Sequence, residues 1–101
     1  MVWDLRGALL KKQEVESARL AEFDFRLRVR TMRLLASQLG VEEEELVSAI
    51  MRKPDALVLA DLAGRLGVEP ADLQQRHDAC GITARAQLVD ELGDPTPHKL
   101  A

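Results

Sequence analysis

The sequence predicts an all-α protein, a small bundle of four to five helices with a long N-terminal helix, and three observations support this prediction. Residues 35–42 (Leu-Ala-Ser-Gln-Leu-Gly-Val-Glu) have a near repeat at residues 62–69 (Leu-Ala-Gly-Arg-Leu-Gly-Val-Glu). Each copy is typical of a helix that ends at glycine, a short turn and the acidic start of another helix. Residues 5–39 contain no proline. Hydrophobic residues make up 47% of the chain but aromatic residues only 3%, which favours helix packing over sheets.

The N-terminal helix is predicted to span residues 5–39 and to end at Gly40, as one long helix or as two nearly collinear ones. Asp4 can cap its start, and apolar residues recur at helical spacing between Leu20 and Leu39. The first half of this stretch is highly charged and only weakly hydrophobic. Because helices without tertiary packing are marginal, we expect that half to be partly disordered when it is unbound.

A proline and a glycine separate the next two predicted helices. The second helix is expected over residues 42–52, with the four glutamates 42–45 in its first turn, where the helix dipole favours carboxylates. Pro54 breaks the chain after it. A third helix is expected over about residues 55–66 and ends at Gly67.

Two further helices are predicted in the C-terminal part of the chain. Pro70 is expected to start a helix over residues 70–79, because proline is favoured in a first helical turn. Gly81 is expected to end it. Thr83 is then a suitable N-cap for a last short helix over residues 83–92.

The predicted elements divide the chain into three segments. Residues 1–19 form a basic N-terminal segment, residues 20–93 the helical bundle, and residues 94–101 a flexible tail that begins Asp-Pro-Thr-Pro. Connections of two to four residues force consecutive bundle helices to fold back on one another.

The charge of the chain is unevenly distributed. The formal net charge is -3. Residues 1–33 carry eight basic and five acidic residues, whereas residues 34–101 carry six and twelve. This distribution argues against a general nucleic-acid binder, which normally has a basic domain, and it suits a protein whose N-terminal part meets an acidic partner.

Compartment and membrane association are also constrained by composition. The single cysteine, Cys80, allows neither an intramolecular disulfide nor a metal site built from several thiolates. No stretch approaches the roughly 18 apolar residues of a membrane span, and charged residues interrupt the N-terminal region where a signal peptide would have its apolar core. We therefore expect a cytoplasmic protein that does not insert into membranes.

No set of residues predicts catalysis, and we expect neither an enzyme nor a bound cofactor or metal. His77 precedes Asp78 by one residue, a spacing that does not place both on one helix face, and His98 lies in the tail. Cys80 lies near a predicted helix C-terminus, where the dipole raises a thiol pKa, so an inert and partly buried thiol is favoured over a reactive one. Adjacent helical residues diverge, so the glutamates 42–45 are interpreted as a solvated helix start rather than a cation site.

Four arginines recur near helical spacing in the long helix, and two interpretations are open. They are Arg19, Arg26, Arg30 and Arg33, with Arg28 to one side. They could form a basic stripe that binds an acidic protein or phosphates. Alternatively, they could be ordinary solvated charges whose aliphatic stems cover core leucines.

A helix-turn-helix DNA-binding or antitoxin-like transcriptional regulator is the alternative functional hypothesis. Residues 31–41 and 42–51 have the outline of this motif, but its second helix would present four carboxylates to the phosphates of the duplex. Residues 71–79 offer a second candidate helix with suitable reading side chains, which are Gln74, Gln75 and Arg76.

Several short motifs occur in an order that is similar to a known family. Glu14, Ala18, Ala21, Glu22 and Phe25 have that family's spacing, and residues 25–36 (Phe-Arg-Leu-Arg-Val-Arg-Thr-Met-Arg-Leu-Leu-Ala) resemble its Phe-basic-x-x-Ala-Arg-x-x-basic-Leu-Leu-Gly signature. Further similar motifs are Leu39-Gly40, Ala60-Asp61-Leu62, Asp78-Ala79-Cys80-Gly81-Ile82 and Asp90-Glu91-Leu92. Over residues 14–92 the chain thus resembles the zeta subunit, the ATP synthase inhibitor of alphaproteobacteria. It departs from the family at Ala36, where the family has glycine, and at its N-terminus.

The resemblance implies a fold, a partner and a mechanism. Members of the family have four helices and bind the catalytic head subunits of ATP synthase. An N-terminal segment becomes helical as it inserts at a catalytic subunit interface, where it blocks the reverse, ATP-hydrolysing rotation. Carried over to this chain, the resemblance implies an insertion segment and peripheral contacts. The insertion residues would be Trp3, Leu5, Arg6, Leu9, Leu10, Lys11 and Lys12, and the peripheral contacts Arg19, Arg26 and Arg30.

Overall fold

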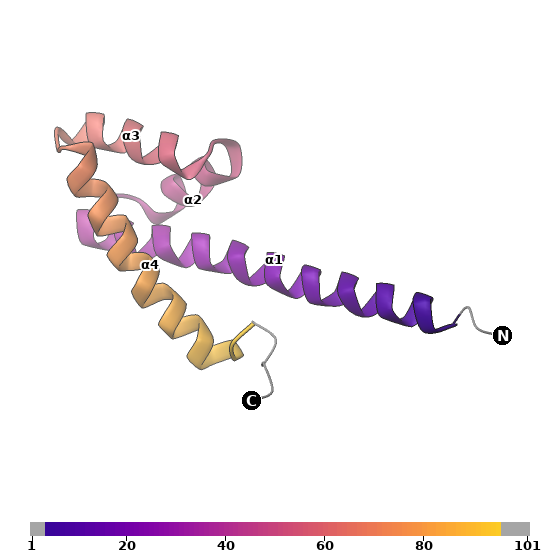
Figure 1. Cartoon of the computed structure of the whole chain (residues 1–101). Helices are drawn as coiled ribbons and strands as arrows, with labels where there is room; N and C mark the ends of the chain where they lie inside the picture. Colours follow the sequence, from indigo (N-terminus) through magenta and orange to yellow (C-terminus); the bar gives the residue numbers. More distant parts are fainter. Residues whose placement is uncertain (1–3, 96–101) are drawn as a thin grey trace.

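Four α-helices make up the part of the chain that the computed structural model describes, and the predicted all-α bundle is confirmed. The structure describes the backbone of residues 4–95 and the side chains of Val15 and of residues 17–95. The helices, in chain order, are α1 (Asp4–Leu39), α2 (Glu43–Arg52), α3 (Asp55–Leu66) and α4 (Pro70–Leu92). Figure 1 shows α2 and α3 stacked at the C-terminal end of α1, and α4 returning across α1.

α1 is a single continuous helix that extends beyond the bundle. Its 36 residues span about 54 Å at the usual rise per residue. The first buried side chain among those described is Phe23, whereas Val15 is 60% exposed. The radius of gyration is 17.7 Å, well above the roughly 13 Å of a compact chain of this length. The molecule is therefore elongated, and the N-terminal turns of α1 project from the bundle (Figure 1).

The repeated sequence pattern forms the same helix end twice, as predicted. Gly40 and Gly67 follow α1 and α3 with φ angles of 70° and 67°, the left-handed conformation that suits glycine. The backbone amide of the next residue, Val41 or Val68, donates to the carbonyl oxygen five residues earlier at 3.0 and 3.1 Å. This bond satisfies a carbonyl that would otherwise lack a helical partner. Each corner joins its two helices through three residues, 40–42 and 67–69.

The prediction that Gly81 ends a helix is wrong, and so is the prediction that Thr83 caps another. α4 runs unbroken from Pro70 to Leu92. Cys80 and Ala84 on either side of the glycine are buried, so tertiary packing outweighs the cost of glycine inside a helix. A Cβ at this position would lie 3.9 Å from Oγ1 of the buried Thr31 on α1. Gly81 therefore marks the place where α4 crosses α1 closely.

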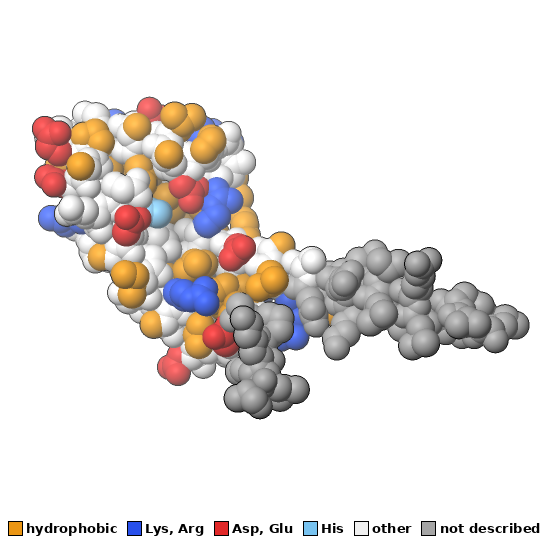
Figure 2. All heavy atoms as spheres, in the orientation of Figure 1, with side chains coloured by type: hydrophobic (Ala, Val, Ile, Leu, Met, Phe, Trp, Pro, Cys, Tyr) orange, Lys and Arg blue, Asp and Glu red, His pale blue; other side chains and the backbone are white. Residues whose placement is uncertain are grey.

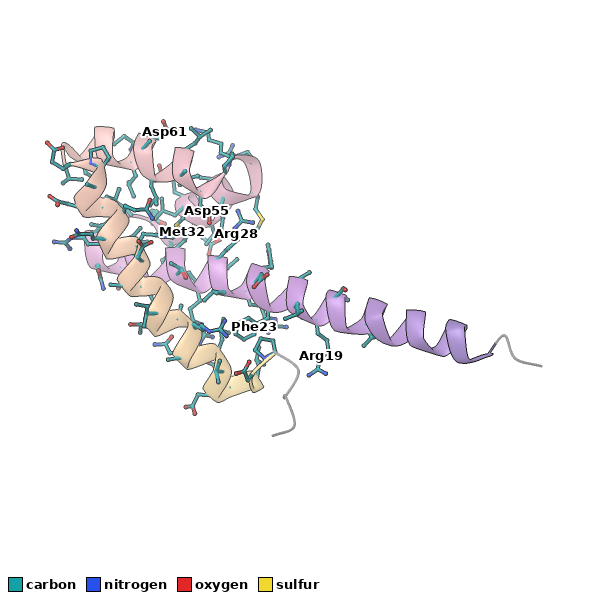
Figure 3. All side chains as sticks on the ribbon, viewed as in Figure 1. Arg19, Phe23, Arg28, Met32, Asp55 and Asp61 are labelled. Atoms are coloured by element: carbon teal, nitrogen blue, oxygen red, sulfur yellow. The ribbon has the colours of Figure 1, made fainter. Side chains whose placement is uncertain are left out.

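The buried side chains form one main core and a smaller group beside it. The main core joins all four helices and contains Met32, Leu35, Ala36, Leu46, Ile50, Val58, Leu59, Leu62, Ala63, Leu73 and Cys80. Phe23, Ala84 and Leu88 are buried outside it. Phe23 lies in the angle between α1 and the C-terminal part of α4 (Figure 3), with the Arg85 guanidinium carbon 5.5 Å from the centre of its ring. This smaller group is the part of the packing nearest to the projecting end of α1.

Two glycines, Gly64 inside α3 and Gly67 directly after it, should respond oppositely to alanine. Gly67→Ala forces a β-carbon into the left-handed conformation and should lower the free energy of unfolding by about 1 kcal/mol. Gly64→Ala, inside the same helix, meets no atom within 4 Å and should raise it by about 0.5–1 kcal/mol through better helix propensity. Urea unfolding followed by circular dichroism measures both. Equal effects of the two substitutions would contradict the assigned helix end.

Candidate functional site

The residues that the sequence predicts for partner binding, apart from Trp3, belong to the projecting part of α1 or to its junction with the bundle. We call residues 4–22 the arm. Leu5, Arg6, Leu9, Leu10, Lys11 and Lys12 lie on the helical backbone of the arm, although their side chains are outside the described residues. Trp3 also lies outside the described residues. The structure describes the side chains of Arg19, Arg26 and Arg30, and places them where the arm meets the bundle.

Every described side chain of the arm is exposed. These are Val15 and residues 17–22. Leu20 is the most covered of the large apolar ones and is still 36% exposed. The bundle therefore buries none of the described side chains of the arm, whereas α1 from Phe23 onward supplies one wall of the bundle.

Arg30 joins α1 to the last turns of α4. Its Nη2 donates to Oε1 of Glu91 at 2.9 Å, and Nη1 also contacts the same carboxylate and Gln87. This hydrogen bond lowers the pKa of Glu91 below its usual range and raises the pKa of the Arg30 guanidinium. Arg30 is therefore part of the fold as well as a predicted contact residue.

Arg28 joins α1 to the corner between α2 and α3. Nη2 donates to Oδ1 of Asp55 at 2.6 Å, and Nε lies 3.2 Å from both carboxylate oxygens. Nη2 also donates to the backbone carbonyl of Ile50 at 3.0 Å. Figure 3 shows Arg28 pointing from α1 toward Asp55. The hydrogen bond to Asp55 raises the pKa of Arg28. One guanidinium thus holds the end of α2 and the start of α3 together.

The glutamates at the start of α2 are exposed, as predicted, but they also form ion pairs. Nη1 of Arg33 lies 3.3 Å from Glu43 and 3.5 Å from Glu44, and Arg65 on α3 contacts Glu45. Among the described residues no group of three or more acidic, histidine or cysteine side chains could hold a metal ion. The helix start is therefore tied to α1 and α3 rather than only solvated.

Arg19 and Arg26 differ from Arg28, Arg30 and Arg33 because neither forms an ion pair with another of the described helices. Nη2 of Arg26 donates to Oε1 of Glu22 at 2.9 Å, one turn earlier on α1. Arg19 forms no ion pair with any residue whose side chain is described. Both line a hollow of about 200 Å³ at the end of α4, next to Phe23 and Leu92. Their guanidinium groups are consequently the ones that a partner can reach at the junction.

His77 on α4 lines a hollow together with Arg28 and Asp55. Nδ1 of His77 lies 3.2 Å from Oδ1 of Asp78, although adjacent residues were expected to point apart. The reason is that Asp78 bends toward its own helix surface, where Gln74 also donates to it at 2.8 Å. The Gln74 bond and then the His77 contact lower the pKa of Asp78. Figure 2 shows a histidine in pale blue with acidic and basic side chains around it.

Cys80 is more deeply buried than the partly buried thiol that the sequence predicts. The thiol is only 2% exposed, and its burial raises its pKa. The sequence reasoning assigned the raised pKa to a helix C-terminus, and α4 does not end there. Burial favours the neutral thiol, which is the weaker nucleophile. Cys80 is therefore a core side chain.

The two candidate DNA-reading helices are α2 and the first part of α4. The N-terminus of α2 exposes Glu42 and the three glutamates that follow, which would face duplex phosphates with negative charge. The second candidate is not a separate helix but the first part of α4. Its Gln74 amide already bonds Asp78, while Arg76 is exposed.

No family model, curated protein or solved structure matches this chain. Its function must be inferred from its own residues and geometry. None of the described helices is both long enough and apolar enough to cross a membrane.

The Arg30–Glu91 pair should make part of the stability depend on pH. The folded state lowers the pKa of Glu91, so the pair stabilises the fold above the unfolded value of about 4.3 and is lost as pH falls through the lower, folded value. Glu91→Gln should be less stable than the wild type at pH 7, and the difference should shrink toward pH 3. Urea unfolding at several pH values measures it.

Asp90→Asn is the matched control for this prediction, because it removes the neighbouring carboxylate and leaves the pair intact. It should stay close to the wild type at pH 7. A stability difference between Glu91→Gln and the wild type that is the same at every pH would contradict the pairing.

Proposed function

We propose that this protein is a non-enzymatic inhibitor of ATP hydrolysis by ATP synthase, of the zeta type, and that its arm inserts at an interface between catalytic head subunits. The observation that carries the proposal is the arm itself, a helical extension of α1 whose described side chains are all exposed. The sequence resemblance over residues 14–92 names the partner. A four-helix bundle with a long first helix is the architecture that the resemblance implies.

The composition of the arm suits insertion between subunits. Its apolar residues include Leu5, Leu9, Leu10 and Val15, and Arg6, Lys11 and Lys12 lie among them. A helix of 19 residues reaches about 28 Å, which is enough to enter well below a protein surface. Apolar side chains would supply most of the binding energy, and the basic ones would direct the arm toward acidic surfaces.

The continuity of α1 supports a mechanical block. The same helix forms the arm and, from Phe23 onward, the wall of the bundle. A catalytic interface that opens and closes during rotation would have to expel or bend this helix. The whole molecule measures 30 and 22 Å along its two shorter axes, so the bundle at the other end is wider than a single helix and would remain outside the interface. The arginines at the junction, Arg19 and Arg26, would then lie at the rim of the interface.

Deleting residues 1–19 should abolish inhibition and leave a folded bundle. The deletion removes the proposed insertion residues, whereas every buried side chain that the structure describes lies at or after Phe23. The concentration for half-inhibition should rise by at least about 100-fold, equivalent to about 2.7 kcal/mol, because several anchor residues are lost together. The measurement is ATP hydrolysis by alphaproteobacterial ATP synthase against protein concentration, with circular dichroism to verify folding.

Leu57→Ala is the control variant, because Leu57 is exposed on α3, away from the arm. It should inhibit as the wild type does. Inhibition that survives the deletion would disprove insertion by the arm, and a folded wild-type protein that does not inhibit at all would disprove the proposed function. A mobility shift of duplex DNA at low salt, weakened by Arg76→Ala, would favour the helix-turn-helix hypothesis instead.

A further inference from the structure

The bundle carries a second apolar feature that its own packing does not use. Phe23 and Phe25 are two residues apart on α1, and a helix turns by about 200° over that distance. Phe23 is accordingly buried against α4 at 4% exposure, whereas Phe25 is 44% exposed. Of the two aromatic side chains that the structure describes, one therefore belongs to the core and the other faces solvent.

Phe25 forms part of a hollow between α1 and the C-terminal part of α4. The hollow has a volume of about 200 Å³, and we call it the docking hollow. Its apolar lining comes from Phe25 and Val29 on α1 and from Leu88 on α4, and the rest of its lining is basic. The basic residues are Arg26, Arg30 and Arg33. No carboxylate lines it among the residues that the structure describes.

The ion pairs of Arg26 and Arg33 are open to exchange. The Arg26 side chain is 52% exposed and its partner Glu22 is 62% exposed. Arg33 lies 3.3 Å from Glu43, and both side chains are nearly half exposed. Exposed pairs of this kind contribute little to stability because water screens them. A carboxylate brought in by a partner can therefore replace an internal one at small cost.

We propose that the docking hollow receives an acidic amphipathic helix of the ATP synthase head and so fixes the bundle on the outside of the interface that the arm enters. This inference rests on the proposed function and adds a second contact with the head, made by the docking hollow, to the contact made by the arm. An apolar side chain of the partner helix enters the hollow against Phe25. Carboxylates one turn away on either side bind Arg26 and Arg33.

Charge complementarity favours a helix over an anionic membrane surface. Glu22, Glu43 and Glu91 lie close to the arginines because they pair with them, and the chain as a whole has a net charge of -3. A flat anionic bilayer would meet these carboxylates together with the arginines. A helix places single carboxylates at fixed spacing, so it can contact the arginines and avoid the glutamates.

The test measures binding of the full-length chain to the purified catalytic head by surface plasmon resonance. Phe25→Ala should raise Kd at least tenfold, mainly through faster dissociation, because an exposed aromatic anchor is lost. Arg26→Glu should also raise Kd and should make binding less sensitive to salt. Phe25→Ala should still block hydrolysis at saturating concentration, since the arm is unchanged.

Met51→Ala is the matched control, because Met51 is a large exposed side chain at the far end of α2, 54% exposed and outside the hollow. Its Kd should equal that of the wild type. The urea midpoint of each variant shows that its fold is intact. If the wild type binds and inhibits but Phe25→Ala has the same Kd, the docking inference alone is overturned. A wild type that neither binds nor inhibits would overturn the proposed function and the docking inference with it.

A photoreactive benzoylphenylalanine at position 25 identifies what the hollow contacts. A crosslink to an acidic helix of the head supports the inference, and a crosslink confined to a basic or extended segment contradicts it. Vesicles of phosphatidylcholine and phosphatidylglycerol are the competing probe. Binding to them that is lost in Phe25→Ala, with head binding unaffected, would assign the hollow to a membrane surface instead.

Discussion

The burial of one face of α1 is the interaction on which the rest of the structure depends. Met32, Leu35 and Ala36 are fully buried, and both α2 and α4 pack against α1. The backbone of α3 packs on α2 and α4 and does not approach that of α1. The position of α3 is therefore set indirectly, through its neighbours and through the ion pair of Arg28 with Asp55. A change that disrupted this face of α1 would disturb the packing of α2 and α4 directly and that of α3 through them.

The elements that could be predicted from the sequence are those that local chemistry determines. Gly40 and Gly67 end their helices because the left-handed conformation and the returning backbone hydrogen bond need only nearby residues. Gly81 has the same local character, yet it lies inside α4, because the buried side chains beside it pack on a helix some fifty positions earlier in the sequence. Tertiary contacts override the local helix-ending preference of Gly81. A single sequence does not reveal such contacts.

In the candidate site, too, local features could be predicted from the sequence and long-range contacts could not. The spacing of the arginines on one helix could be predicted, but their partners could not, since Arg28 binds Asp55 across 27 positions and Arg30 binds Glu91 across 61. Pairing with other helices turns Arg28 and Arg30 into structural residues and leaves Arg19 and Arg26 as the accessible ones. The exposure of Phe25 follows from helix geometry once the burial of Phe23 is known. The sequence alone does not show which of the two phenylalanines faces the core.

The way in which α1 serves both the bundle and the arm has an energetic consequence for binding. Starting a helix is the costly step, because the first turn fixes several residues for one hydrogen bond, whereas adding a residue to an existing helix is nearly neutral. The packed part of α1, from Phe23 onward, already supplies that first turn for the arm. An arm that extends a packed helix loses less conformational entropy on binding than a free segment that must fold at the interface. More of the energy gained by burying its apolar side chains then remains as affinity, which favours the inhibitory role proposed for the arm.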